Sequence, residues 1–332
     1  MKINRQRIMC MKEVLKKIML FIILSLCFSV TGQQDAQYTQ YMYNTAIINP
    51  AYTGSRGKTS ISGLSRRQWV GFEGGPATHT LAFETPLDRF SNFNYGLSII
   101  SDHIKPTTET NFSLDFAYRL RVTDTGFLRF GTKIGGNLLN ANLTNLSREE
   151  TIDNALLNDI DNKFIPNFGL GVYYHNDQFY AGISAPNMLT TNFFNEESVS
   201  SSAGNTVLLS KQRVNYYFIA GHTFDLSYNV KFKPAVLTKV VSGAPLQVDI
   251  SVNFLIFQKF TVGTAYRLSA AFSGLFGYQL SKSLMVGLSY DVDASELIST
   301  STNYGSFEFV MRYDLKNKLN LTSKRMLTPR FF

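Results

Sequence analysis

Most of the chain is organised by an alternation of apolar and polar residues with a period of two. From Phe112 to Arg121, large apolar residues take the even positions, and polar or small residues take the odd ones. The segments 246–257, 259–268 and 283–292 repeat the pattern. Because successive side chains of a β-strand point to opposite sides, each segment predicts a strand with one apolar and one polar face.

The alternation predicts an all-β fold with about fourteen strands. Most of these segments have about nine to thirteen residues, which fits strands that cross a membrane at a tilt better than the shorter strands of soluble sheets. The predicted strands are 58–65, 77–85, 93–102, 109–121, 125–138, 164–175, 177–185, 211–225, 228–240, 246–257, 259–268, 271–281, 283–292 and 304–315.

The connections between these segments alternate between two kinds. The even-numbered ones are mostly tight turns, and the longest of them is 86–92. Four of the odd-numbered ones are long: 66–76, 139–163, 186–210 and 293–303. Short turns at one rim and long loops at the other are typical of bacterial outer-membrane barrels. We therefore predict an antiparallel up-and-down barrel over 58–315, with both termini in the periplasm.

Periodicity alone does not say whether the apolar faces point outward or inward. Charged residues make up 17% of the chain, against roughly 25% in soluble domains, and aromatic residues reach 14%. The polar faces carry Arg and Lys in the middle of strands, with small residues between them. A polar lumen accommodates such residues. The apolar faces are therefore predicted to contact lipid, as in an integral protein of a Gram-negative outer membrane.

The N-terminus has the features of an export signal. Lys12, Lys16 and Lys17 precede an apolar run over 18–30, which is shorter than the ~20 residues of a membrane-spanning helix. Cleavage before Gln33 removes residues 1–32, which contain six of the 32 basic residues and one of the 24 acidic ones, so the net charge falls from +8 to +3. The charge of the mature chain then gives no argument for nucleic acid. Both cysteines also leave, so no thiol chemistry is expected.

Two segments lack the strand pattern. Residues 33–57 are predicted either to lie across the periplasmic mouth or to enter the lumen. The tail 316–332 is basic and ends in Arg330, Phe331 and Phe332. It has two interpretations, a solvated tail with an aromatic signal for barrel assembly or a docking peptide for a periplasmic partner.

Catalytic, cofactor and metal sites are not predicted, and the protein is not expected to be an enzyme. No histidine among His79, His103, His175 and His222 has a metal-ligand spacing. An outer-membrane hydrolase would need a serine and a histidine together, and His79 could meet Ser60 on an adjacent strand, but any fourteen strands rich in serine supply such pairs. Whether the loop acids Asp153, Asp159 and Asp161 bind Ca²⁺ stays open.

One long connection combines residue types that carry binding energy in protein interfaces. Arg66, Arg67, Gln68 and Phe72 surround Trp69, the only tryptophan. Arg and Trp contribute strongly to recognition when they are desolvated. The alternatives are a tryptophan of the aromatic belt with arginines reaching lipid headgroups, or a loop that folds into the lumen.

The chain also resembles a known family. The residues that carry the resemblance are Gln33–Tyr38, Gln40–Asn44, Asn49–Gly54, Arg67–Trp69 with Gly71–Phe72, Gly74–Thr78, Ser101–Ile104 and the closing Pro329–Phe332. Together they resemble the PorP/SprF family of type IX secretion membrane proteins. At the end of the chain, Phe331 stands where the family usually has Tyr.

The resemblance implies an outer-membrane component of type IX secretion or gliding motility. It implies a secreted type IX substrate or a large adhesin as partner, in some members a peptidoglycan-associated lipoprotein, and no cofactor. Our first hypothesis is a barrel that supports export or surface attachment by binding. The alternative is a passive channel or solute transporter lined by Arg119, Arg129, Lys133 and Arg267.

Overall fold

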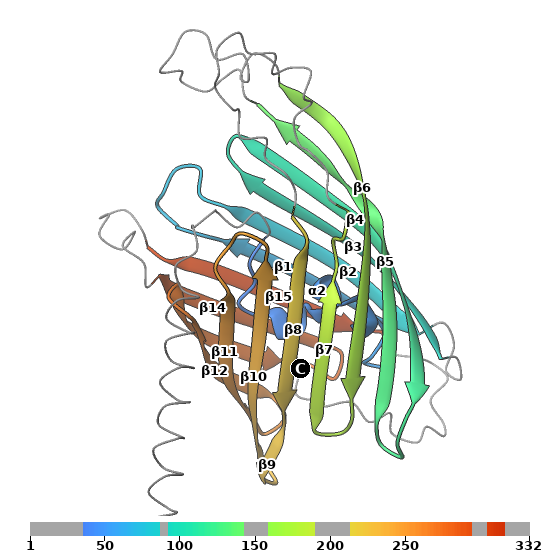
Figure 1. The fold of residues 1–332 in the computed structure, drawn as a ribbon. Coiled ribbons are helices and arrows are strands. Elements are labelled where there is room, and N and C mark those ends of the chain that lie inside the picture. The colour runs from blue at the N-terminus through green and yellow to red at the C-terminus, as the bar shows by residue number, and fades with distance from the viewer. Residues whose placement is uncertain (1–35, 87–91, 143–158, 190–212, 294–303, 316–332) are drawn as a thin grey trace, which may run out of the picture.

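The computed structural model describes residues 36–86, 92–142, 159–189, 213–293 and 304–315. Most of these residues form one antiparallel sheet that makes up the wall of a barrel (Figure 1). The strands are β1 (Ser60–Arg67), β2 (Ala77–Pro86), β3 (Phe93–Ile104), β4 (Thr107–Arg121), β5 (Phe127–Ala141), β6 (Ile160–His175), β7 (Phe179–Ala185), β8 (Asn215–His222), β9 (Phe224–Ser227), β10 (Val230–Val241), β11 (Gln247–Ile256), β12 (Phe260–Arg267), β13 (Ala271–Gln279), β14 (Leu284–Asp293) and β15 (Ser306–Asp314).

The sheet closes on itself. β1 pairs with β2 on one side and with β15 on the other, and β10 pairs with β11. β8 and β9 both pair with β10, and only Thr223 separates them. They are therefore one interrupted strand, and the described residues form a closed barrel of fourteen strands. This confirms the predicted fold class, although the expected single strand 211–225 is divided.

The wall has an apolar outer face and a polar inner face. In β12 and β15, exposed and buried residues alternate at every position. Outward residues such as Val262, Phe309 and Met311 are exposed and apolar, whereas inward residues such as Asn253 and Ser289 are buried and polar. A soluble barrel would reverse this arrangement, so the outer face matches the predicted contact with lipid.

Aromatic rings form bands at the ends of the apolar surface. At one end, rings on adjacent strands follow one another from Phe179 to His222, Phe224, Phe232 and Phe254, with centroids 4.3 to 6.5 Å apart. At the other end, the rings of Tyr290 and Phe307 lie 4.8 Å apart. Such rings sit at the level of lipid headgroups in outer-membrane barrels.

The two rims of the barrel differ. We call the rim with the long connections 68–76, 142–159, 186–214 and 294–305 the loop rim, and it also has the shorter connections 105–106, 242–246 and 268–270. The opposite rim, with connections 122–126, 176–178, 228–229, 257–259 and 280–283, is the turn rim. The division into long and short connections follows the prediction. By the general pattern of bacterial barrels, the loop rim is expected to be the outer one.

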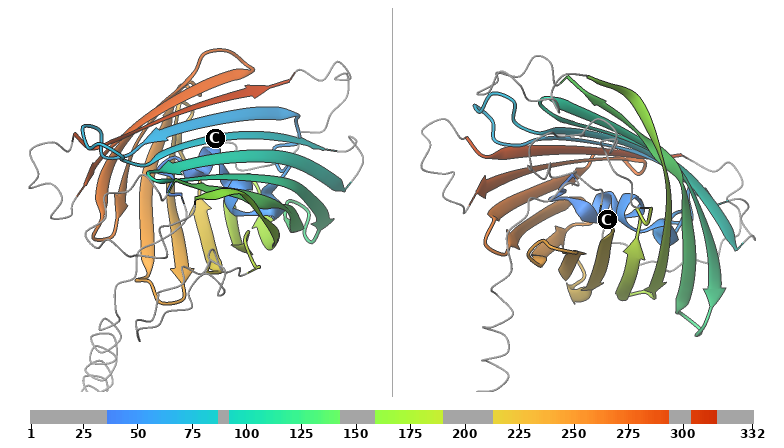
Figure 2. Two further views of the ribbon diagram at one scale, coloured as in Figure 1. Left: turned by 90° about the horizontal axis from the view of Figure 1, so that it is seen from above. Right: turned by 45° about the horizontal axis from the view of Figure 1, so that its top comes forward.

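Residues 36–57, which we call the plug, lie inside the barrel (Figure 2). They form three short helices, η1 (Tyr41–Tyr43), α2 (Thr45–Ile48) and η2 (Pro50–Tyr52). The Asn49 side chain accepts a hydrogen bond from the Ala51 N–H and so caps η2, whose first residue is proline. No helix in the described part of the chain has the length and apolar character to span a bilayer.

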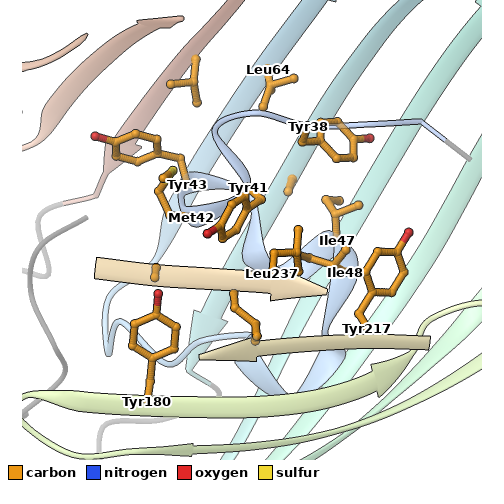
Figure 3. Close-up of a cluster of buried hydrophobic side chains, with 14 of the residues drawn as sticks. Tyr38, Tyr41, Met42, Tyr43, Ile47, Ile48, Leu64, Tyr180, Tyr217 and Leu237 are labelled. Atoms are coloured by element: carbon orange, nitrogen blue, oxygen red, sulfur yellow. The ribbon is translucent and has the colours of Figure 1, made fainter. Parts of the chain in front are cut away.

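The apolar side chains of the plug pack against apolar residues of the wall. Tyr41, Met42 and Ile48 lie in one buried cluster with wall residues of β1, β7, β8 and β10: Leu64, Tyr180, Tyr217 and Leu237 (Figure 3). Of the two places predicted for 33–57, the described residues therefore occupy the lumen. The lumen is a packed interior at this level.

A charge placed on the outer face tests its contact with lipid. Leu288 lies in the middle of β14 and is 55% exposed, so Leu288→Arg should destabilise the barrel by about 2–4 kcal/mol in lipid. Leu246, at the loop rim, is similarly exposed, and Leu246→Arg should cost only about 0–1 kcal/mol. Urea unfolding in lipid vesicles measures both. Equal stability of the two variants and the wild type would contradict a lipid-facing surface.

Candidate functional site

The residues proposed for recognition at the loop rim separate into two groups. The predicted strand 58–65 continues to Arg67, and this extension turns Arg66 into the lumen, where its side chain is 2% exposed. Arg66 Nη2 lies 2.7 Å from Asp291 Oδ2, and Nη1 lies 3.1 Å from Glu308 Oε2. Arg66 is therefore a lumen residue. This corrects the prediction that it is a surface-accessible recognition residue.

The other four residues stay at the rim. Arg67 and Phe72 are exposed, and Gln68 and Trp69 are half-buried. Hydrogen bonds tie the loop to the connection before β15: Val70 N–H donates to Gly305 O at 2.9 Å, and Tyr304 N–H donates to Val70 O at 2.8 Å. The loop therefore does not fold into the lumen, which removes one of the alternatives.

Trp69 has an unusual backbone conformation. Its φ of 51° lies in the left-handed region, which a bulky side chain rarely adopts. The Trp69 N–H donates to Ser306 Oγ at 3.3 Å and helps to hold the residue there. Non-glycine residues in this region cost about 1–3 kcal/mol and are frequent at functional sites.

Charged side chains of the wall bind the backbone of the plug. Glu308 accepts hydrogen bonds from the Thr39 and Gln40 N–H groups at 2.9 and 2.7 Å. Arg129 donates to Ala51 O at 2.9 Å and to Thr53 O at 2.6 Å. Buried backbone groups that lack a hydrogen-bond partner cost free energy, and these side chains supply the partners. These charges therefore hold the short, irregular plug in place.

Glycines of the wall provide the space for the plug. A Cβ atom on Gly131 would overlap the backbone at Ala51, and one on Gly171 would overlap the Asn49 side chain. A Cβ on Gly277 would lie 2.9 Å from the Tyr43 hydroxyl. By contrast, a Cβ on Gly274 meets nothing within 4 Å. The inner wall is thus shaped to the plug at several heights.

The arginines and lysine proposed to line a pore are occupied with other contacts. Arg267 Nε lies 2.8 Å from Asp249 Oδ1, and Lys133 Nζ lies 2.8 Å from Asp115 Oδ1. Arg129 holds the plug, and Arg119 donates to Asn92 Oδ1 at 3.3 Å near the turn rim. These side chains form no continuous free basic track through the described lumen.

A small cavity remains between the plug and the wall. It measures about 70 Å³ and is lined by plug residues such as Tyr38 and Ile47 and by wall residues such as Lys133 and Tyr217. A water needs about 10–15 Å³ of such space, so the cavity has room for on the order of five waters. It is too small to serve as a pathway for solutes.

The histidines do not meet the partners that were considered for a hydrolase or a metal site in the described residues. His79 pairs with Ser65 and points outward, whereas Ser60 pairs with Glu84 and points inward, so the pair considered for a hydrolase does not meet. No group of three or more metal-ligating side chains occurs among the residues that the structure describes. Asp153, Arg330, Phe331 and Phe332 lie outside the described residues.

The closed barrel, the outward apolar belt and the aromatic bands define an outer-membrane β-barrel protein. A family model described as "Type IX secretion system membrane protein PorP/SprF" matches residues 30–313. The chain therefore belongs to the PorP/SprF family, and it is an outer-membrane barrel of type IX secretion. The family is one of membrane proteins of a secretion system.

Three solved structures are similar to this chain at low sequence identity. The toluene transporter TbuX of Ralstonia pickettii is 11% identical over 82% of this chain and 93% of its own, with a TM-score of 0.49. The toluene transporter TodX of P. putida is 11% identical over 82% and 94%, with a TM-score of 0.46. The porin KdgM is 7% identical over 77% and 99%, with a TM-score of 0.39. No curated protein sequence matches the chain.

Proposed function

We propose that the loop rim binds a secreted partner protein, either a type IX substrate or a large adhesin, and thereby supports its export or its attachment to the cell surface. The observation that carries this proposal is the β1–β2 loop. It presents Trp69 in a strained conformation between exposed Arg67 and Phe72, at the rim that faces outward in bacterial barrels. In members that serve gliding, such binding would keep the adhesin at the surface.

The β1–β2 loop costs free energy to form, because it holds Trp69 in a strained backbone conformation. A tryptophan of the aromatic belt sits on an outward position of a strand and requires no unusual backbone. Trp69 follows the end of β1, and three backbone or side-chain groups of the 304–306 segment hold the loop. A preorganised aromatic residue beside an arginine is the arrangement that gives large binding energies in protein interfaces.

The filled lumen argues against the alternative of a passive channel. Polar contacts join the plug to β5, β6, β7, β11 and β15, and the cavity beside Tyr38 and Ile47 is small. A partner that binds at the rim needs no open pathway. In this proposal the barrel is therefore a rigid support for its loops.

The turn rim has a separate expected partner. A periplasmic, peptidoglycan-associated lipoprotein would bind there, and the C-terminal tail with Arg330, Phe331 and Phe332 is the segment proposed to dock it or to direct barrel assembly. Both roles remain predictions.

Replacing Arg67 and Trp69 with alanine tests the proposed recognition element. Because both side chains lie at the rim, the double variant should assemble normally and lose most of the partner from the cell surface. A loss of about 2 kcal/mol or more, which is roughly 30-fold in affinity, is expected for such residues. Surface-exposed partner is measured by antibody binding to intact cells.

The matched control is Tyr228→Ala. Tyr228 is an aromatic residue that is 92% exposed at the turn rim, so its removal should leave partner display unchanged. Barrel assembly in each variant is checked by the gel shift between heated and unheated samples. Wild-type amounts of partner on cells with a fully assembled double variant would remove these residues from the site.

A further inference from the structure

Two adjacent turns at the turn rim differ from the others. Three turns are polar at their centres, and a side chain of each accepts hydrogen bonds from nearby backbone N–H groups. They are 122–126 with Thr123, 176–178 with Asn176 and 280–283 with Ser281. The turns 228–229, between β9 and β10, and 257–259, between β11 and β12, show no such bond among the described residues. Apolar side chains stand there instead, since Leu226 is 59% exposed and Phe257 is 61% exposed.

The two apolar turns lie side by side. Phe257 N–H donates a hydrogen bond to Asn229 O at 2.8 Å, and β10 pairs with β11 directly behind them. On the other side, Thr223 N–H donates to Gln178 O at 2.7 Å, and β9 continues past this contact, beyond the 176–178 turn (Figure 1). The two turns therefore form one exposed surface at the end of the barrel.

The second of these turns has an unfavourable backbone. Phe257 and Gln258 have φ values of 53° and 55°, as in two-residue hairpin turns that usually contain Asn and Gly. A bulky residue with a positive φ costs free energy, and such residues cluster at functional sites. Because the Phe257 ring is largely exposed, packing within the barrel contributes little to holding it there. A contact outside the barrel is the remaining physical reason for a phenylalanine in this turn.

The apolar side chains lie past the level of the lipid headgroups. Phe224 and Phe254 belong to the aromatic band at this end of the barrel. Leu226 is two residues and Phe257 three residues further towards the rim, which corresponds to about 7 and 10 Å in the strand direction. The two side chains therefore face water rather than acyl chains. Exposed apolar groups gathered at one place are typical of surfaces that bind another protein.

The same surface is positively charged. Lys259 and Lys282 are exposed in the 257–259 turn and in the next turn along the rim. These two turns and the 228–229 turn contain no acidic residue. Asp225, on β9, pairs with Lys231 at 2.7 Å and does not offset the two lysines. We call the set Leu226, Phe257, Lys259 and Lys282 the tip surface.

We propose that the tip surface docks a periplasmic protein through a segment that carries apolar side chains for Leu226 and Phe257 and acidic side chains for the two lysines. This gives the partner expected at the turn rim a site on the barrel itself. The inference rests on the proposed function only for the orientation of the barrel, because the turn rim faces the periplasm when the loop rim faces outward.

The two kinds of side chain have separate roles in the docking. Opposite charges guide the encounter and exclude basic partners, whereas the apolar side chains supply the contact that removes water. Tyr228 is 92% exposed and so contacts little of its own hairpin, and it is not part of the tip surface.

A photoreactive residue at position 226 tests the docking in living cells. Leu226→p-benzoylphenylalanine is irradiated in intact cells, and the cross-linked peptide is identified by mass spectrometry. The expected result is an adduct with one protein, at a peptide that contains both acidic and apolar residues. The matched control places the photoreactive residue at Asp177, which is exposed in the polar 176–178 turn and should give no such adduct.

Further substitutions in the Leu226→p-benzoylphenylalanine protein test the chemistry of the surface. Phe257→Asn removes the ring but suits a positive φ, so the barrel should fold normally and the adduct yield should fall by about tenfold. Lys259→Glu with Lys282→Glu should lower the yield by a similar factor, whereas Lys259→Arg with Lys282→Arg should keep it. The gel shift between heated and unheated samples confirms folding.

Three results would overturn the docking surface. They are adducts with phospholipid alone, equal adducts from positions 226 and 177, and a protein adduct whose yield is the same in all the variants. Failure of the proposed function is read separately, from the surface-exposed partner in the Arg67 and Trp69 variant, because those residues lie at the opposite rim.

Discussion

Removing the plug should convert a silent barrel into a conducting one. Wild-type protein in planar bilayers is expected to give no steady current, because residues 36–57 and their wall contacts fill the lumen. Barrels of about eight strands are filled by their own side chains, but those of 16–18 strands hold an aqueous channel. A wall of fourteen strands lies nearer the second case, so its side chains alone should leave a water-filled pathway.

Two variants separate loss of the plug from loss of the barrel. The first deletes residues 38–55. The second, Gly131→Val, keeps the full chain and places a side chain where the plug backbone passes Ala51. Both should give long-lived open currents. Gly274→Val is the matched control, because that strand glycine faces open space and the variant should stay silent.

The outcome distinguishes a plugged support from a channel. Steady currents from the wild type, as large as those of the deletion, would show that the plug does not seal the lumen and would favour the solute-transporter alternative. Silence of both plug variants, with folding confirmed by the gel shift, would show that the wall closes without the plug.

The barrel was predictable from the sequence because its signal is local. Each strand repeats its own alternation, so all fourteen predicted segments correspond to strands of the wall. The predicted strand bounds are wrong where pairing with a neighbouring strand extends beyond the apolar–polar alternation. β6 begins at Ile160 rather than 164, where Asn162 has a positive φ and the pairing with β5 shifts register. Residues 160–163 show no alternation of apolar and polar positions. They belong to the strand because β5 pairs with them.

The site was less predictable because its contacts are not local. Ending the first strand at 65 placed Arg66 in a loop, although the alternation of inward Ser62 and Leu64 continues to it. Its carboxylate partners, Asp291 and Glu308, lie more than two hundred positions away in the chain. A pattern with a period of two shows which face a residue occupies, but not which charge it meets.

The position of the plug was also hard to predict, because it is set by contacts with residues that are distant in the chain. Its sequence lacks strand alternation, and its burial comes from wall residues on many strands. The sequence has glycine at the inward positions Gly131 and Gly171. These small residues indicate that the lumen has room for the plug next to the wall. Burial raises the pKa of the Tyr41 phenol, so its hydroxyl stays protonated and shares a hydrogen bond with Ser251, a contact that no local pattern indicates.

Arg66→Ala should destabilise the barrel by about 3–5 kcal/mol, because it leaves Asp291 and Glu308 buried without their cation. Both carboxylates also bind the start of the plug, since Asp291 accepts from Thr39 Oγ1 at 2.6 Å and Glu308 from two N–H groups. The loss should therefore also loosen the plug at the loop rim. Urea unfolding in lipid vesicles, followed by the gel shift, measures the change.

The adjacent arginine provides the control. Arg67 is exposed at the same rim, so Arg67→Ala should change stability by no more than about 0.5 kcal/mol. The neutral triple variant Arg66→Met, Asp291→Asn and Glu308→Gln should recover most of the loss, because no uncompensated charge remains in this network. Wild-type stability of Arg66→Ala would contradict the buried network, and it would return Arg66 to the set of residues available to a partner.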